Sequence, residues 1–64
     1  MNDSELRERL FTEGIMTFGS LDEFEKWLGT QSRDLNWKKP KDLLNTEENT
    51  QRVIDLLGRM REKA

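Results

Sequence analysis

The residues best suited to chemistry lie in one short stretch, Trp37-Lys38-Lys39-Pro40-Lys41, where an aromatic ring precedes three ammonium groups. Such a stretch can stack its ring on a nucleobase while the lysines meet phosphates, or it can hold an acidic partner. The simpler interpretation is that Trp37 folds back on the core and leaves the lysines in solvent. We favour it over nucleic-acid binding, because the chain has a net charge of −2 and nucleic-acid binders are usually basic.

Catalytic and metal-binding patterns are missing from the sequence. It has no histidine and no cysteine, which are the commonest acid–base residue and the thiolate metal ligand. It also has no Gly-rich phosphate loop, HExxH or GxSxG motif, and no calcium-binding loop. Its carboxylates gather at Asp22-Glu23 and Glu47-Glu48, where the first turn of a helix favours negative charge. We therefore expect neither an enzyme nor a metal or cofactor site.

The length of 64 residues allows one domain, which buries only about 60% of the surface that the unfolded chain exposes. Without disulfides, the core or a partner chain must supply its stability. No apolar run approaches the ~20 residues of a membrane span, and the N-terminus lacks the pattern of a signal peptide. We expect one cytoplasmic domain over residues 1–64, with no membrane contact.

Hydrophobic periodicity predicts an all-α fold, a compact bundle of about four helices of which the third is very short. The first helix ends at Gly19. Gly14 lies in the middle of its apolar half, where it lets another helix approach closely or else breaks the helix; we favour the first. Met16 points the other way, which is unremarkable unless it belongs to a subunit contact.

Local signals mark the remaining helices. Ser20 and Glu23 form a capping box, and Phe18 and Phe24 are placed as a hydrophobic staple. Gly29 suits a left-handed residue that closes the second helix.

After a loop over residues 30–37, Pro40 begins the short third helix, which continues through Leu44. Thr46 caps the last helix, and basic residues at its C-terminal end suit the helix dipole. The predicted core comprises Leu10, Phe18, Phe24, Trp27, Leu28, Leu35, Pro40, Leu43, Leu44, Val53, Leu56, Leu57 and Met60.

Several short pieces follow one another in a familiar order. They are Phe18-Gly19-Ser20, Trp27-Leu28, Leu35, Lys38, Pro40, Leu43-Leu44, Thr46, Val53 and Asp55-Leu56-Leu57-Gly58-Arg59. Over roughly residues 5 to 61, this order resembles the C-terminal toxin-binding domain of the Xre/MbcA/ParS antitoxin family.

The resemblance implies part of a bacterial type II toxin–antitoxin system. Members usually carry an N-terminal DNA-binding domain that represses the operon, and we expect none in this chain. Their C-terminal domain pairs with a copy of itself and binds a RES-domain toxin, which acts on NAD, so that access to the toxin's active site is blocked. Lys38 stands at a basic position of the family, and Arg59 lies in the terminal helix that is expected to meet the toxin.

The sequence departs from the family at Trp37 and Asn49, where glycine is common. The hypothesis is thus an antitoxin that binds a toxin, with a homodimer expected. Two alternatives stay open: a stand-alone homodimerisation or adaptor module, and weak single-stranded nucleic-acid binding through residues 37–41. The candidate partner-binding residues are Trp37, Lys38, Lys39, Ile54, Arg59, Arg61 and Lys63, with Met16 and Ile54 contributing apolar area if they are exposed.

Overall fold

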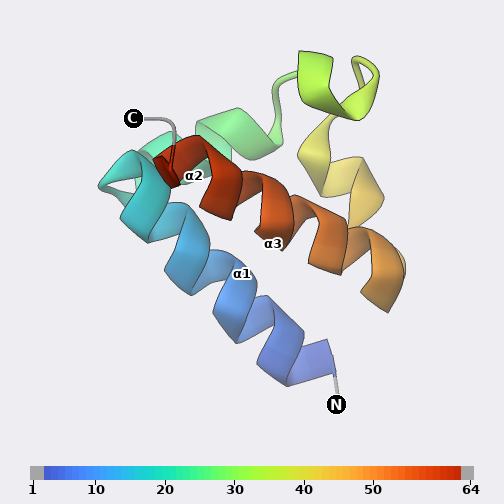
Figure 1. Cartoon of the computed structure of the whole chain (residues 1–64), viewed down its shortest axis with the longest axis horizontal. Helices are drawn as coiled ribbons and strands as arrows, with labels where there is room; N and C mark the ends of the chain where they lie inside the picture. Colours follow the sequence, from blue (N-terminus) through green and yellow to red (C-terminus); the bar gives the residue numbers. More distant parts are fainter. Residues whose placement is uncertain (1–2, 63–64) are drawn as a thin grey trace.

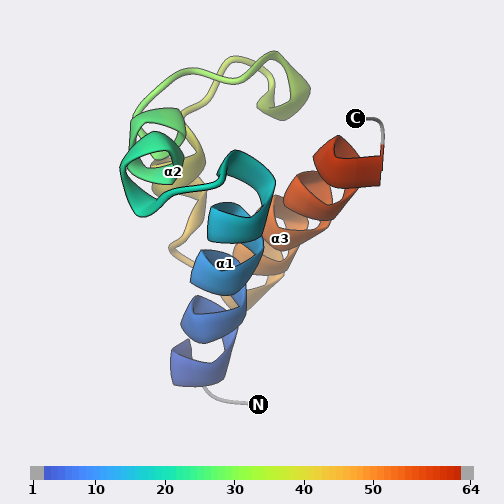
Figure 2. The same ribbon diagram turned by 90° about the vertical axis from the view of Figure 1, so that its left-hand side faces the viewer.

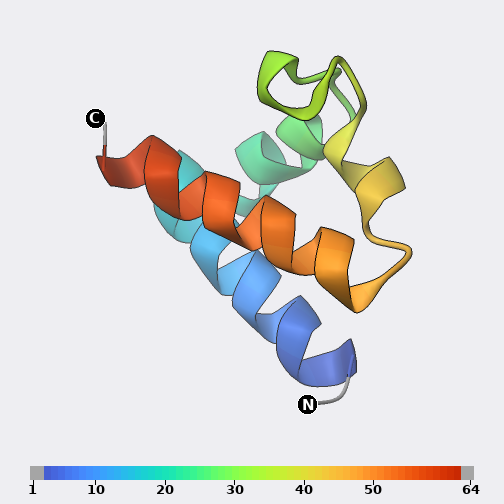
Figure 3. The same ribbon diagram turned by 45° about the vertical axis from the view of Figure 1, so that its right-hand side comes forward.

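Two long helices lie side by side and form the base of the molecule. The computed structural model describes residues 3–62, in which α1 (Asp3–Phe18) and α3 (Glu47–Glu62) make the most extensive contact between elements. They run in the same direction, so their C-terminal ends lie at the same end of the molecule (Figures 1 and 3). Parallel neighbours need a long connection, and residues 19–46 supply it.

The connection contains one α-helix and two short 3₁₀ helices. The α-helix is α2 (Leu21–Leu28), and the 3₁₀ helices are η1 (Arg33–Leu35) and η2 (Pro40–Leu43). After α2 the chain arches away from α1 before it returns to begin α3 (Figures 1 and 2). The all-α class is confirmed, but the count of about four helices is slightly wrong. The expected short third helix is the 3₁₀ turn η2, and η1 lies within the expected loop.

The predicted helix starts are present as hydrogen bonds. The Glu23 amide donates to Ser20 Oγ at 3.2 Å, and the Asn49 amide donates to Thr46 Oγ1 at 3.0 Å. The other half of the predicted capping box, from the Ser20 amide to the Glu23 carboxylate, is absent from the described residues: that carboxylate lies 3.6 Å from Lys26 Nζ. At the other end of α2 the expected left-handed Gly29 is wrong, because its φ is −93° and its amide donates to the carbonyls of Glu25 and Lys26. A tightened last turn closes this helix instead.

Gly14 brings α1 and α2 together. The helix continues unbroken through Gly14, and a β-carbon there would overlap the ring of Phe24, which is fully buried. The predicted close approach of a second helix is therefore confirmed. Around Phe24 lie Phe18, with ring centroids 6.2 Å apart, and Trp27, also at 6.2 Å.

The core lies where α1, α2 and α3 meet. Its buried apolar residues are Leu6, Leu10, Phe24, Val53, Ile54 and Leu57, with Pro40 also buried; Phe18, Trp27, Leu28, Leu43, Leu44 and Met60 are partly buried against them. Leu6 was missing from the predicted core. Leu35 and Leu56, which were expected in it, are only half-buried.

The face of α3 that is buried differs from the one predicted from its apolar residues. Ile54, a candidate for partner binding, is only 3% exposed, so that prediction is wrong. Thr50, one helical turn before Ile54, is also buried, and its hydroxyl donates to the Thr46 carbonyl at 2.8 Å. A threonine satisfied in this way can face the core, so the buried arc shifts toward Thr50 and Ile54 and leaves Leu56 at its edge.

Candidate partner-binding surface

Residues 32–38 form a loop closed by its own backbone hydrogen bonds. The Ser32 amide donates to the Lys38 carbonyl at 3.0 Å, and the Trp37 amide donates to the Ser32 carbonyl at 2.8 Å. The Leu35 amide also donates to Ser32 O, at 3.1 Å. To close so tightly, the chain adopts left-handed conformations at Asn36 (φ 58°) and Trp37 (φ 65°). Asparagine is common in that region, whereas a bulky residue there costs about 1–3 kcal/mol.

Trp37 projects from this loop into solvent. Its exposed fraction is 61%, so the expectation that it folds back on the core is wrong. The physical reason is the loop's conformation: two successive left-handed residues reverse the chain, and the half-buried apolar side chain of this loop is Leu35. The other tryptophan, Trp27, is half-buried and lies 5.5 Å from the ring of Phe18.

The lysines beside Trp37 are exposed to solvent. Lys38, Lys39 and Lys41 are all exposed, and no carboxylate among residues 3–62 forms an ion pair with them. Together with Trp37 they form a surface that we call the Trp–Lys loop, residues 37–41. A shallow hollow beside it is lined in part by Trp37, Lys38, Lys39 and Asp42.

A groove separates this region from α3. It has a volume of about 440 Å³, and it brings together two predicted site residues that are far apart in sequence, Lys38 and Arg59. Its apolar lining is supplied by Leu35, Leu43, Leu56 and Met60. The incomplete burial of Leu35 and Leu56 is thus explained, because their exposed parts line the groove.

The charges of the groove divide into paired and unpaired groups. Arg52 lies 3.7 Å from Glu48, and Asp55 accepts a hydrogen bond from Gln51 at 3.0 Å. Lys38 and Arg59 make no ion pair within residues 3–62. Asp34 also lines the groove, exposed and without an ion pair within residues 3–62. Lys38 and Arg59 are therefore the cations at the groove that are free to meet a partner's acidic side chains.

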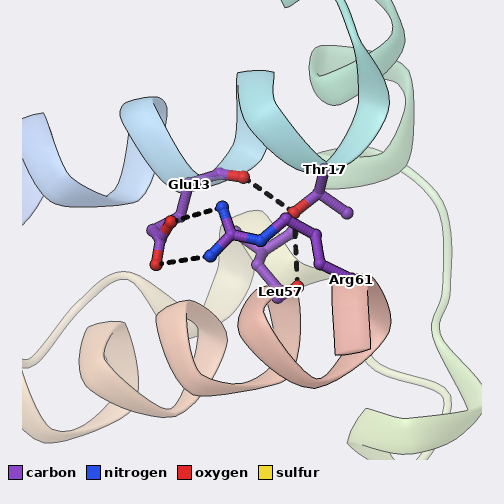
Figure 4. A network of polar contacts seen from close by, with 4 residues as sticks. All are labelled: Glu13, Thr17, Leu57 and Arg61. Atoms are coloured by element: carbon purple, nitrogen blue, oxygen red, sulfur yellow. Dashed lines mark hydrogen bonds and ion pairs between the residues drawn. The ribbon is translucent and has the colours of Figure 1, made fainter. Parts of the chain in front are cut away.

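Arg61 forms an ion pair with Glu13 inside the chain (Figure 4). Its Nη2 donates to Glu13 Oε1 at 3.1 Å, and its Nη1 lies 2.6 Å from Oε2. Nη1 is buried and outside hydrogen-bond geometry, so charge attraction holds it. Thr17 lies on the next turn of α1, and its hydroxyl is 2.7 Å from the Glu13 carbonyl and 3.2 Å from that of Leu57. This pair joins α1 to α3 and leaves Arg61 unsuited to a partner contact.

The last candidate, Lys63, lies outside the described residues. The seven candidates thus divide: Trp37, Lys38, Lys39 and Arg59 share one side of the molecule, around the loop and the groove. Ile54 and Arg61 hold the fold together.

A second exposed apolar region was only partly foreseen. Phe11 and Ile15 are each 40% exposed, Leu21 is 43% exposed, and Met16 is 63% exposed. All four lie on α1 or at the start of α2. Of these four residues, only Met16 was singled out from the sequence, as a possible part of a subunit contact.

Among residues 3–62 there is no group of three or more acidic side chains placed to hold a metal ion. No helix in this part of the chain is long and apolar enough to cross a membrane. The surface features that remain are a basic aromatic loop, a partly apolar groove and an exposed apolar helix face. These features define a small all-helical domain suited to binding another protein.

The chain belongs to the family described as the antitoxin Xre/MbcA/ParS C-terminal toxin-binding domain, whose family model matches residues 13–63. The resemblance seen in the sequence is thereby confirmed, and the partner of such a domain is a toxin. No curated protein and no solved structure matches the chain. The groove and the Trp–Lys loop both lie within the matched residues.

Proposed function

We propose that the chain is the toxin-binding part of a bacterial type II antitoxin, acting in the cytoplasm, and that it neutralises its toxin by covering the toxin's active site. The observation that carries this proposal is the groove, which lies within the family-matched residues and places Lys38 and Arg59, without an ion pair among residues 3–62, beside apolar side chains. Apolar contacts of this kind supply binding energy, while charges at the rim increase association rate and specificity.

The proposed role is binding without catalysis. The toxin that we propose is of the RES-domain type, which acts on NAD, as the family resemblance implies. A rigid surface suits such inhibition, because pre-organised groups lose little conformational entropy on binding. The Glu13–Arg61 pair fixes α3 on α1 and so contributes to this rigidity.

The experiment is an inhibition titration with the toxin that is encoded beside this chain's gene. The purified toxin is assayed for NAD consumption while the chain is added in increasing amounts. We expect activity to disappear at a fixed stoichiometry, together with a stable complex in size-exclusion chromatography. A stable complex with full activity would refute occlusion of the active site, and the absence of a complex would refute the antitoxin role.

The exposed apolar face of α1 supports self-association, as a homodimer or as a stand-alone dimerisation module. Phe11 and Ile15 are one helical turn apart on the same side of α1, and Leu21 is nearby in sequence at the start of α2. Apolar residues that form a contiguous exposed patch often mark a protein interface. Sedimentation equilibrium of the wild-type chain and of Ile15→Asp tests this: we expect a dimer and a monomer respectively. A monomeric wild-type chain at high micromolar concentration would overturn it.

A further inference from the structure

Trp37 occupies a backbone conformation that suits glycine. Its φ of 65° lies in the left-handed region, which bulky residues rarely adopt. The preceding residue, Asn36, is also left-handed, but asparagine is among the residues that tolerate this conformation. Gly19, with a φ of 84°, shows the residue type that such a conformation ordinarily takes. The loop would therefore close more easily with a glycine at position 37.

The side chain of Trp37 makes few contacts that would offset this strain. It is 61% exposed, and the aromatic ring contacts of the described residues are confined to Phe11, Phe18, Phe24 and Trp27. The packing of the isolated domain therefore does not explain why a large, mostly exposed aromatic side chain stands at a position where it strains its backbone. Strained residues that persist without a folding role point to function.

The charges around Trp37 indicate what it meets. Lys38 and Lys39 line the hollow beside it together with Asp42, and Lys41 is close in sequence. All three lysines are exposed and form no ion pair with any carboxylate of residues 3–62. The chain as a whole is acidic, so this local positive charge differs from the remaining surface. An exposed tryptophan flanked by cations fits an apolar pocket edged by carboxylates.

Resting on the proposed function, we propose that Trp37 is the specificity-determining anchor of the toxin contact. Its indole enters an apolar pocket on the toxin, and the ammonium groups of Lys38 and Lys39 face carboxylates at the edge of that pocket. Buried tryptophans at the centre of an interface commonly dominate its binding energy. A protein occupant is favoured over a nucleic acid by the net charge of −2, by Asp42 beside the loop and by the family match.

Trp37→Gly separates binding from folding, because the two effects have opposite signs. The probe is a catalytically inactive form of the toxin encoded beside this chain's gene. With Trp37→Gly we expect its Kd, measured by calorimetry, to rise about 30-fold or more, as for an interface hot spot. The melting temperature should stay level or rise, because the left-handed strain is relieved. Trp37→Phe, which keeps an aromatic ring, should recover a large part of the affinity.

Asn36→Gly is the matched reference for stability, since it makes the same change of backbone freedom one position earlier without removing an indole. If Trp37→Gly lowers the melting temperature well below that of Asn36→Gly, Trp37 has a structural role and the inference is overturned. An unchanged Kd for Trp37→Gly overturns it as well.

A direct readout comes from ¹⁹F NMR of the chain labelled with 5-fluorotryptophan. The signal missing in Trp37→Gly belongs to Trp37, and we expect its solvent isotope shift to vanish on adding toxin while the Trp27 signal changes little. A complex in which Trp37 stays exposed overturns this inference and leaves the proposed function standing. No complex with the wild-type chain overturns the proposed function and this inference together. Tight, strongly salt-dependent binding of a thymidine 20-mer that Trp37→Gly abolishes would assign the loop to nucleic acid instead.

Discussion

The ring of Phe24 lies against the α-carbon of Gly14, in the space that any larger side chain at that position would need. At Gly14 itself, no side chain of α1 separates the helix backbone from this ring. The contact places Phe24 at the centre of the core, where Phe18 and Trp27 pack around it. Glycine is thus required at this position by packing, although it lowers helix propensity.

Gly14→Ala should lower the free energy of unfolding by about 1–3 kcal/mol, because the added methyl group overpacks the contact with Phe24. Alanine's higher helix propensity, worth about 1 kcal/mol, works in the opposite direction. Gly58→Ala in α3 is the control, since a β-carbon there meets nothing within 4 Å; it should raise stability. Urea unfolding measures both, and equal effects of the two variants would contradict the packing explanation.

Glu13→Gln should destabilise the domain by about 1–2 kcal/mol, between the values for exposed and buried ion pairs. The side chains of Glu13 and Arg61 are 26% and 30% exposed, so solvent screens their attraction only in part. Glu48→Gln breaks a pair with Arg52 that is mostly exposed, and it should change stability by less than about 0.5 kcal/mol. A double-mutant cycle with Arg61→Gln isolates the coupling between Glu13 and Arg61; zero coupling would show that the pair does not hold α3 on α1.

Thr46→Ala should cost about 0.5–2 kcal/mol, because the Asn49 amide loses its side-chain acceptor at the start of α3. Thr46→Ser keeps a hydroxyl and should retain most of the stability. Thermal unfolding followed by circular dichroism compares the two variants. If both lose the same amount, the lost contribution belongs to the methyl group and not to the cap.

Lys38→Glu and Arg59→Glu should slow association with the toxin several-fold at low ionic strength, with little change in the dissociation rate. The reason is that both cations border the groove and have no ion pair within the described residues 3–62. Arg9→Glu on α1 changes the net charge equally and should have a much smaller effect. Stopped-flow association at two salt concentrations tests this, and an equal slowing by all three variants would show that net charge alone governs the rate.

Features fixed by neighbours in sequence were predicted well. The caps at Ser20 and Thr46 depend on side chains that reach an amide three residues away, so local pattern suffices to find them. The end of α1 at Gly19 follows in the same way, because its positive φ suits glycine. The family resemblance added the partner class, which no local pattern carries.

Features fixed by tertiary packing were missed. Ile54 and Thr50 are both buried on α3, and which side of α3 is buried depends on its packing against α1. Likewise, the outward direction of Trp37 follows from loop closure between Ser32 and Lys38. The pairing of Arg61 with Glu13 could not be predicted from local sequence patterns, because the two residues are 48 positions apart.

The self-closed loop at residues 32–38 has an evolutionary consequence. Its backbone hydrogen bonds begin and end within the loop, and Leu35 is its inward anchor. Mutations at the loop's tip therefore leave the packing between the helices intact. On the role proposed for Trp37, part of the partner choice rests on a loop residue that the core does not use, so selection can vary this contact without first rebuilding the core.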